Sequence, residues 1–215
     1  TYHPEGEALL REIAELKPQP AYIRCHHLLT SGDGSVSLKW SSTNAYTEDK
    51  EGNPVYDWTL IDRNFDTYIA LGLRPLVEIG FMPEALSRSP EDYTPEPLLE
   101  GKPQGRVGGG AFQPPKDYDK WATFIEAWAQ HCVERYGKDE AEAWYWELWN
   151  EPNIAYWQGT LEEYCTLYDY TAHALRTVLP AARIGGPHVT NPQSPSSEPF
   201  LRGFVEHCLG GKNAA

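Results

Sequence analysis

The sequence WYWELWNEPN, residues 144–153, decides the fold, because an aromatic run ends there in an amide, a carboxylate and a proline. Tryptophan and tyrosine crowd its first six positions, which favours a buried β-strand over a loop. Pro152 cannot donate a hydrogen bond to a sheet and therefore stops the strand. Asn150 and Glu151 are thus predicted where a strand leaves the core. The alternative is a structural turn in which Glu151 is solvated or caps the next helix.

Composition limits the class of protein and its partners. The 215 residues are 40% hydrophobic, which is enough for a real core. A formal net charge of −13 would repel a nucleic acid or an anionic membrane surface, so neither is expected as a partner. No apolar run is long enough to cross a membrane and no basic leader precedes the first helix. We therefore expect a soluble protein, cytoplasmic or secreted.

Cofactor signals are missing from the sequence. The four cysteines are scattered, without a CxxC pair or a histidine at zinc-finger spacing, so we expect mostly buried free thiols, although an even number permits two disulfides. No glycine-rich phosphate loop follows any predicted strand, which disfavours a nucleotide-dependent enzyme. Neither a metal nor a cofactor is expected.

Hydrophobic periodicity and breakers predict alternating helices and strands. Helices are expected at residues 7–17, 60–72, 117–136, 161–179 and 197–209, and strands at residues 21–25, 74–79, 144–149 and 182–186. This alternation requires right-handed crossovers and a parallel sheet covered by helices, hence an α/β fold. Residues 30–55 form a long polar connection. Residues 88–118, rich in Pro, Gly and charge, are predicted as a long surface loop within one domain, residues 1–215.

Two architectures fit this order, a doubly wound sheet and a (β/α)₈ TIM barrel. Polar residues gather at the carboxyl ends of all four strands, which is where a barrel builds its active site. They are His26 and His27, Glu78, Asn150 and Glu151, and His188. Because only four strands are visible, the chain is predicted to be part of a TIM barrel.

The residues at this point resemble the retaining glycoside hydrolases of clan A, and within them family 39, which contains β-xylosidases and α-L-iduronidases. WNEPN at 149–153 resembles the acid/base motif at the end of barrel strand four, YIRCHHLL at 22–29 is similar to the family pattern YIRxHxLL, and LVEIGFMPEAL at 76–86 and IGGP at 184–187 resemble the third and fifth strands. The resemblance implies strands two to five of eight. It also implies a glutamate nucleophile on strand seven, beyond Ala215, so we expect little or no turnover from the isolated chain.

The chemistry of a retaining glycosidase gives these residues their expected roles. Such an enzyme uses two carboxyl groups about 5–5.5 Å apart, one as general acid/base and one as nucleophile. The resemblance makes Glu151 the acid/base, with Asn150 donating to the sugar 2-hydroxyl and His26 bonding to the sugar. Phe81 and Trp157 are candidate stacking walls for a sugar ring, with core packing as the competing account.

The leading hypothesis is therefore a β-xylosidase-like retaining glycoside hydrolase acting on a small glycoside or oligosaccharide. The alternative is a non-catalytic carbohydrate-binding module that keeps the aromatic platform. A complementing barrel fragment or a second copy of the chain is the expected protein partner, since four strands twice make eight. The sequence does not select the sugar.

Overall fold

A four-stranded parallel sheet forms the centre of the molecule in the computed structural model, which describes residues 4–16, 20–32, 34, 42–95 and 107–211. Its strands, in the order β1-β4-β7-β8, are β1 (Tyr22–Cys25), β4 (Arg74–Ile79), β7 (Tyr145–Leu148) and β8 (Arg183–Gly185). All three pairings are parallel. The sequence predicted each of these strands to within one or two residues, and β4 at its observed bounds.

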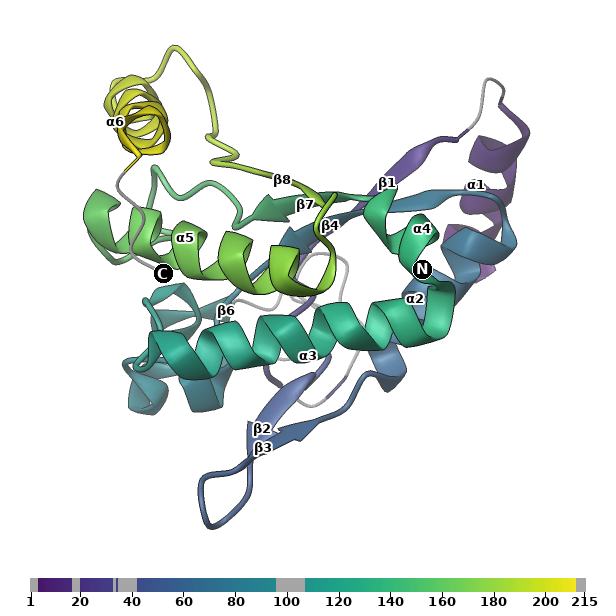
Figure 1. Ribbon diagram of the computed structural model, residues 1–215, viewed down its shortest axis with the longest axis horizontal. Helices are drawn as coiled ribbons and strands as arrows, with labels where there is room; N and C mark the ends of the chain where they lie inside the picture. The colour runs from purple at the N-terminus through teal and green to yellow at the C-terminus, as the bar shows by residue number, and fades with distance from the viewer. Residues whose placement is uncertain (1–3, 17–19, 33, 35–41, 96–106, 212–215) are drawn as a thin grey trace, which may run out of the picture.

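Three helices connect these strands in the described part of the chain: α2 (Thr59–Ala70), α3 (Tyr118–Tyr136) and α5 (Leu161–Val178). A further helix, α1 (Pro4–Glu15), precedes β1, and α6 (Ser197–Gly210) follows β8. α3 and α5 run side by side across one face of the sheet (Figure 1). The strands follow one another in chain order without the reversal of a doubly wound sheet. The fold is therefore the partial barrel that the sequence predicted.

The two faces of the sheet differ because side chains alternate along each strand. One paired row contains Cys25, Val77 and Trp146 and faces the helices. Trp146 there packs edge-to-face against Trp128 of α3, with 5.6 Å between ring centroids. This row forms the tryptophan-rich core of the molecule.

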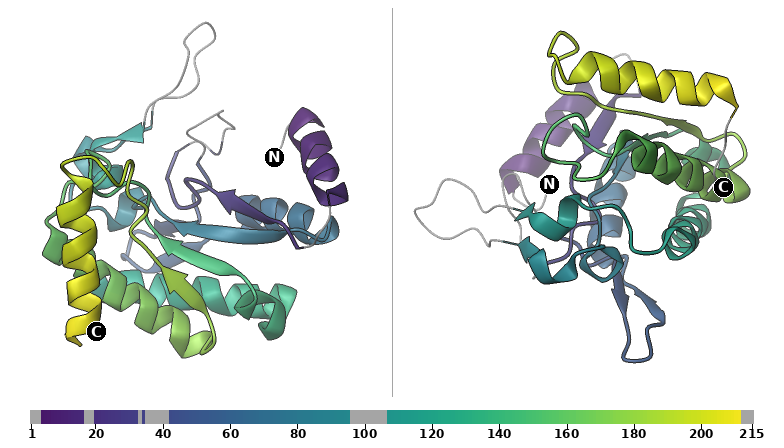
Figure 2. Two further views of the ribbon diagram at one scale, coloured as in Figure 1. Left: turned by 90° about the horizontal axis from the view of Figure 1, so that it is seen from above. Right: turned by 90° about the vertical axis from the view of Figure 1, so that its left-hand side faces the viewer.

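The opposite face of the sheet is polar and open. Its rows pair Arg24 with Leu76 and Tyr145, and Glu78 with Glu147. Tyr145 is 40% exposed, and a cavity of about 350 Å³ lies over this face. In Figure 2 the helices α3 and α5 lie on the other side of the strands. This open face corresponds to the interior of a barrel.

Local signals fix the ends of the helices that flank β7. The Asp117 side chain accepts the backbone N–H of Lys120 at 3.0 Å and caps α3, and Gly137, with a φ of 85°, ends it. α5 begins with a capping box in which Thr160 and Glu163 bond each other's backbone N–H groups, at 3.1 and 2.7 Å. The helices on either side of β7, the strand that leads into WNEPN at 149–153, therefore begin at positions fixed by their own capping side chains.

Three features were not predicted from the sequence. The predicted connection at 30–55 contains a hairpin of β2 (Tyr46–Glu48) and β3 (Pro54–Tyr56), which projects from the body of the molecule (Figure 1). A five-residue helix, α4 (Lys138–Glu142), separates α3 from β7. Within residues 88–118 the structure has η2 (Pro90–Asp92), β5 (Thr94–Pro95), β6 (Val107–Gly108) and η3 (Gly109–Phe112), while residues 96–106 lie outside the described part. Elements of two to five residues are too short to show a period.

The predicted surface loop at 88–118 also turns back into the core. Phe112 is 6% exposed, and the backbone N–H of Met82 donates to the carbonyl oxygen of Ala111 at 3.0 Å. The end of this segment therefore packs beneath the residues that follow β4.

The predicted free thiols are confirmed: Cys25, Cys132 and Cys165 are buried, Cys208 is exposed, and all four are unpaired. Among the described residues, no helix has the length and apolar character needed to cross a membrane.

Candidate active site

Glu151 lies directly beyond the carboxyl end of β7, as the sequence predicted. The backbone N–H of Trp149 donates to the carbonyl oxygen of Ile79 at 3.0 Å, and that of Glu151 donates to the carbonyl oxygen of His188 at 2.8 Å. Trp149 and Glu151 both have left-handed backbone conformations, with φ of 68° and 50°. Such a conformation costs a non-glycine residue on the order of 1 kcal/mol, so the surrounding contacts must hold it in place. The half-buried Glu151 side chain is thus presented between the ends of the strands.

Asn150 is oriented by an arginine from β1. Arg24 donates from Nη2 to Oδ1 of Asn150 at 3.1 Å and from Nε to Oε2 of Glu147 at 2.7 Å. Asn150 is only 5% exposed, so its side chain has little freedom to turn. Because Oδ1 accepts from Arg24, the amide nitrogen Nδ2 is left to donate, and it has no partner among the described residues. The pair therefore presents a fixed hydrogen-bond donor beside Glu151.

A buried carboxylate supports His26. Glu78, the last but one residue of β4, is 0% exposed, and its Oε2 is hydrogen-bonded to Nδ1 of His26. The same oxygen lies 3.8 Å from Nη1 of Arg24. The His26 side chain is 29% exposed, so the far edge of its ring can reach a ligand. Glu78 thus acts on the site through His26 rather than by direct contact with a ligand.

His26, His27 and Glu78 bring three possible metal ligands together, with the ligand atoms within 4.8 Å of one another. Oε2 of Glu78 is already shared between His26 and Arg24, whereas its other oxygen, Oε1, is buried without a hydrogen-bond partner among the described residues. The Arg24 guanidinium, 3.8 Å from Oε2, would repel a divalent ion. The positive charge beside the cluster therefore disfavours a metal there.

Phe81 and Trp157, the predicted stacking walls, are both buried, at 0% and 5% exposure. Both rings pack against Trp149 with centroids 5.1 Å away. Nε1 of Trp157 donates to the carbonyl oxygen of Thr160 at 2.9 Å. Neither ring shows a broad face to solvent, which favours the core-packing account. Together they support the backbone that carries Glu151 from behind.

Burial keeps two neighbouring groups protonated. Desolvation raises the pKa of Cys25 to about 12, so this thiol is no nucleophile at neutral pH. Burial also raises the pKa of Tyr164 well above its ordinary value. Its hydroxyl donates to the carbonyl oxygen of Leu148 at 2.9 Å and fixes the end of β7.

Arg24 and Asn153 belong to this site, although the sequence analysis did not single them out. A charged residue inside a short apolar strand was the available signal for Arg24. Asn153 follows the proline of the motif, and its side chain contacts the segment after β8. The residues that Arg24 and Asn153 contact are visible only in the three-dimensional structure.

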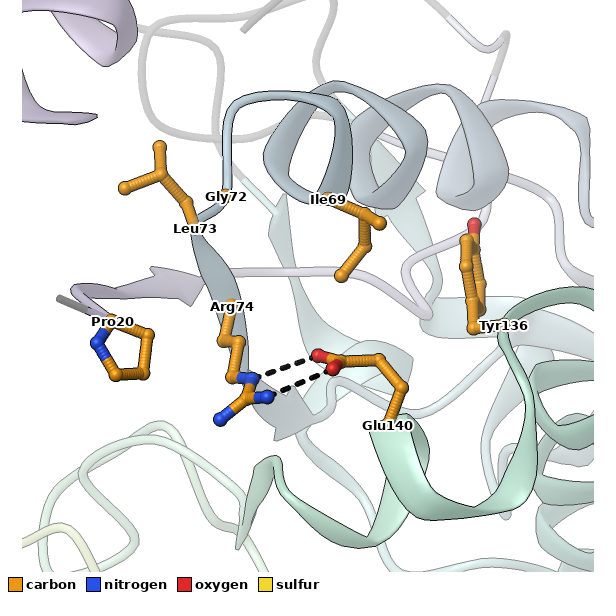
Figure 3. A pocket seen from close by; sticks show the side chains of 7 residues that line it. All are labelled: Pro20, Ile69, Gly72, Leu73, Arg74, Tyr136 and Glu140. Carbon is orange, nitrogen blue, oxygen red and sulfur yellow. Dashed lines mark hydrogen bonds and ion pairs between the residues drawn. The ribbon is translucent and has the colours of Figure 1, made fainter.

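A different cavity, of about 430 Å³, lies at the opposite end of the strands (Figure 3). Arg74 and Glu140 face each other there in a bidentate ion pair, with distances of 2.8 and 2.9 Å. Nε1 of Trp144 donates to the same Glu140 carboxylate at 2.9 Å. Because its charged groups satisfy each other, and because the amino-terminal end of barrel strands serves stability, this cavity is not the candidate site.

Comparison with known proteins identifies the family of the chain. The model of the family "Glycosyl hydrolases family 39" matches residues 12–213. The chain belongs to this family. It is 38% identical over 192 residues to a β-xylosidase of Geobacillus stearothermophilus, covering 87% of this chain and 33% of that protein. An α-L-iduronidase of Homo sapiens is 29% identical over 105 residues, covering 47% of this chain and 16% of that protein.

Solved structures of similar enzymes share the fold. A monomeric β-xylosidase from Caulobacter crescentus CB15 superposes with a TM-score of 0.72 at 27% identity, covering 99% of this chain and 37% of that one. A family 39 enzyme from Xanthomonas axonopodis pv. citri gives a TM-score of 0.69 at 31% identity, covering 94% and 36%. The chain thus spans about a third of the length of these relatives.

Proposed function

We propose that this chain carries the general acid/base half of a retaining, β-xylosidase-type active site, with Glu151 as the acid/base. The observation that carries the proposal is the position of Glu151 beyond β7, beside an Asn150 whose amide is oriented by Arg24 at 3.1 Å. In a retaining glycosidase one carboxylic acid protonates the leaving oxygen, and hydrogen bonds to the sugar 2-hydroxyl strengthen in the transition state.

Each residue then has a defined step. Protonated Glu151 gives its proton to the glycosidic oxygen as the leaving group departs, and the resulting carboxylate later removes a proton from the attacking water. Asn150 Nδ2 donates to the sugar 2-hydroxyl, a bond that strengthens as positive charge develops at the anomeric carbon. His26, held by Glu78, bonds a further sugar hydroxyl. The nucleophile is a glutamate supplied from outside this chain.

The substrate class follows from the relatives. The β-xylosidase of Geobacillus stearothermophilus matches 87% of this chain and that of Caldicellulosiruptor saccharolyticus 77%, whereas the human α-L-iduronidase matches 47%. We therefore propose a β-xyloside as substrate. The open polar face of the sheet suits completion by further barrel strands, from the same protein or a partner.

The test grafts this chain in place of the 192 matched residues of the Geobacillus β-xylosidase, so that Glu151 meets a nucleophile in a complete barrel. We expect hydrolysis of 4-nitrophenyl β-D-xyloside, and a loss of about 10²–10⁴-fold in Glu151→Gln for a substrate with a poor leaving group. Glu162→Gln, on the first turn of α5, is the matched control and should retain activity. Equal turnover of the substrate with the poor leaving group by the Glu151 variant and its parent would refute the role of Glu151.

The isolated chain tests the carbohydrate-binding alternative. Calorimetric titration with xylose and xylo-oligosaccharides, run beside the same hydrolysis assay, separates binding from chemistry. Tight binding of these sugars by the chain, together with no hydrolysis by the graft, would favour the carbohydrate-binding module over the acid/base half of a glycosidase.

A further inference from the structure

We propose that Asn153 is the positioning residue for Glu151, acting as a clamp between the segment after β7 and the segment after β8. The inference rests on the proposed role of Glu151. It identifies the side chain that keeps the carboxyl group in place while the group exchanges its proton.

The Asn153 amide is bonded at both of its ends. Its Oδ1 accepts the backbone N–H of Thr190 at 3.0 Å. Its Nδ2 lies within donor distance of three hydroxyl oxygens, those of Thr190 at 3.0 Å, Ser196 at 3.1 Å and Ser197 at 3.0 Å. Ser197 is 0% exposed and begins α6. One side chain therefore ties the motif to both the loop after β8 and the start of a helix.

Two contacts hold the segments in a common register. The backbone N–H of Glu151 bonds the carbonyl oxygen of His188 at 2.8 Å, and the Asn153 side chain bonds Thr190 two residues further along both segments. Glu151 and His188 are separated by 37 residues in the sequence, and so are Asn153 and Thr190. Two contacts at the same sequence offset fix both the position and the orientation of one segment relative to the other, whereas a single hydrogen bond would let the segments rotate about it.

Glu151 needs such a clamp because its own conformation is not self-supporting. Its φ of 50° is unfavourable for a residue with a side chain. The residue after it, Pro152, has no N–H with which to anchor the loop. The hydrogen bonds of the Asn153 side chain hold the segment where Pro152 offers no backbone N–H. They thereby fix the orientation of Glu151.

Asn153→Asp should preserve part of the clamp, whereas Asn153→Ala should abolish it. A carboxylate can still accept the Thr190 N–H, and the serine and threonine hydroxyls can rotate to donate to it. The negative charge lies at the amino-terminal end of α6, where the helix dipole favours an anion. Asn191→Ala is the matched control, because Asn191 lies in the same loop but is exposed, and among the described residues its side chain bonds only the local backbone N–H of Gln193, at 3.0 Å.

The experiment is hydrogen–deuterium exchange on the chain and these three variants. Asn153→Ala should accelerate exchange about tenfold in peptides covering 149–156 and 186–197, with β4 and β7 unchanged, because a buried hydrogen-bond group loses its partner. Asn153→Asp should lie between Ala and the parent, and Asn191→Ala should match the parent. Unchanged exchange in both loops, or a uniform rise across the strands, would overturn the inference.

A second readout follows the carboxyl group itself and needs no turnover. The ¹³C carboxyl resonance of Glu151, assigned through Glu151→Gln, should move toward that of a solvent-exposed glutamate in Asn153→Ala and partly return in Asn153→Asp. An unchanged chemical shift in both variants would contradict a positioning role of Asn153. Neither measurement depends on hydrolysis, so the two proposals can fail separately. An inactive graft would refute the proposed function but not the Asn153 clamp. An active graft whose two loops do not respond to the Asn153 variants would refute the clamp but not the proposed function.

Discussion

Arg24 of β1 donates a hydrogen bond to the side chain of Asn150, beyond β7, at 3.1 Å, although 126 residues separate the two in the sequence. The strand between them, β4, contributes Glu78, whose Oε2 lies 3.8 Å from the same guanidinium. One arginine therefore connects the ends of three neighbouring strands and sets the geometry around Glu151.

Replacing Arg24 should destabilise the chain strongly. In Arg24→Met, Glu147 loses its ion pair at 2.6 Å and the fully buried Glu78 loses its nearby cation. Glu78 keeps its hydrogen bond to His26, but removing the cation of a partly buried ion-pair network costs about 3 kcal/mol, and urea unfolding would measure the loss. Arg176→Met, at an exposed site on α5, should change the unfolding free energy by less than about 0.5 kcal/mol. Equal effects of the two variants would refute the central role of Arg24.

The capping box at the start of α5 should contribute measurably to stability. Thr160→Ala removes the acceptor of the Glu163 N–H and should lower the free energy of unfolding by about 1 kcal/mol. Thr160→Ser keeps that acceptor and should stay close to the parent. Thr177→Ala, at an exposed position of the same helix, provides the comparison in thermal unfolding. A loss as large in Thr160→Ser would show that the cap is not the cause.

The Asp66–Arg135 pair should give a pH-dependent stability. Arg135 bonds Asp66 at 2.9 and 2.5 Å, and this hydrogen bonding, opposed by burial and assisted by Tyr136, holds the pKa of Asp66 below its ordinary value. The stabilisation is therefore present above the unfolded-state pKa of about 3.9 and is lost as the pH falls through the lower folded-state pKa. Because both side chains are partly exposed, we expect a coupling of about 0.5 kcal/mol.

A double-mutant cycle of Asp66→Asn and Arg135→Gln, measured by urea unfolding at pH 7 and again near the acid limit of stability, checks this sign. The coupling should be present at pH 7 and shrink in acid. A coupling that grows in acid would contradict the assigned direction.

Trp157→Phe distinguishes core packing from sugar stacking. If Trp157 belongs to the core, the loss of its N–H bond to Thr160 and of ring volume should lower the unfolding free energy by about 1–2 kcal/mol. The affinity of the folded chain for xylo-oligosaccharides should then stay unchanged in calorimetry. Reduced affinity with unaltered stability would support a stacking wall instead.

Much of the fold could be predicted from the sequence because it is encoded locally. Compact apolar strands such as β4 and the glycine at 137 that ends α3 are visible as patterns. The hairpin β2–β3 was missed because three-residue strands, one beginning with a proline, show no alternation.

The candidate site was predictable only in part. The chemistry-bearing residues Asn150 and Glu151 stand out as polar groups at a strand end. The Arg24–Asn150 bond and the Asn153 clamp depend on the register between distant segments, which no single stretch of sequence contains. Phe81 packs against Phe112 of η3, with ring centroids 4.8 Å apart, and a linear pattern cannot show this contact between distant segments.

On the proposed role of Glu151, its left-handed φ of 50° sets folding against catalysis at one position. Glycine or asparagine would adopt this backbone with less strain, so a chain selected for folding alone would exchange the glutamate and gain on the order of 1 kcal/mol. A screen for thermostability is therefore expected to enrich substitutions at residue 151, and the variants it returns would be more stable proteins that lack the proposed acid/base.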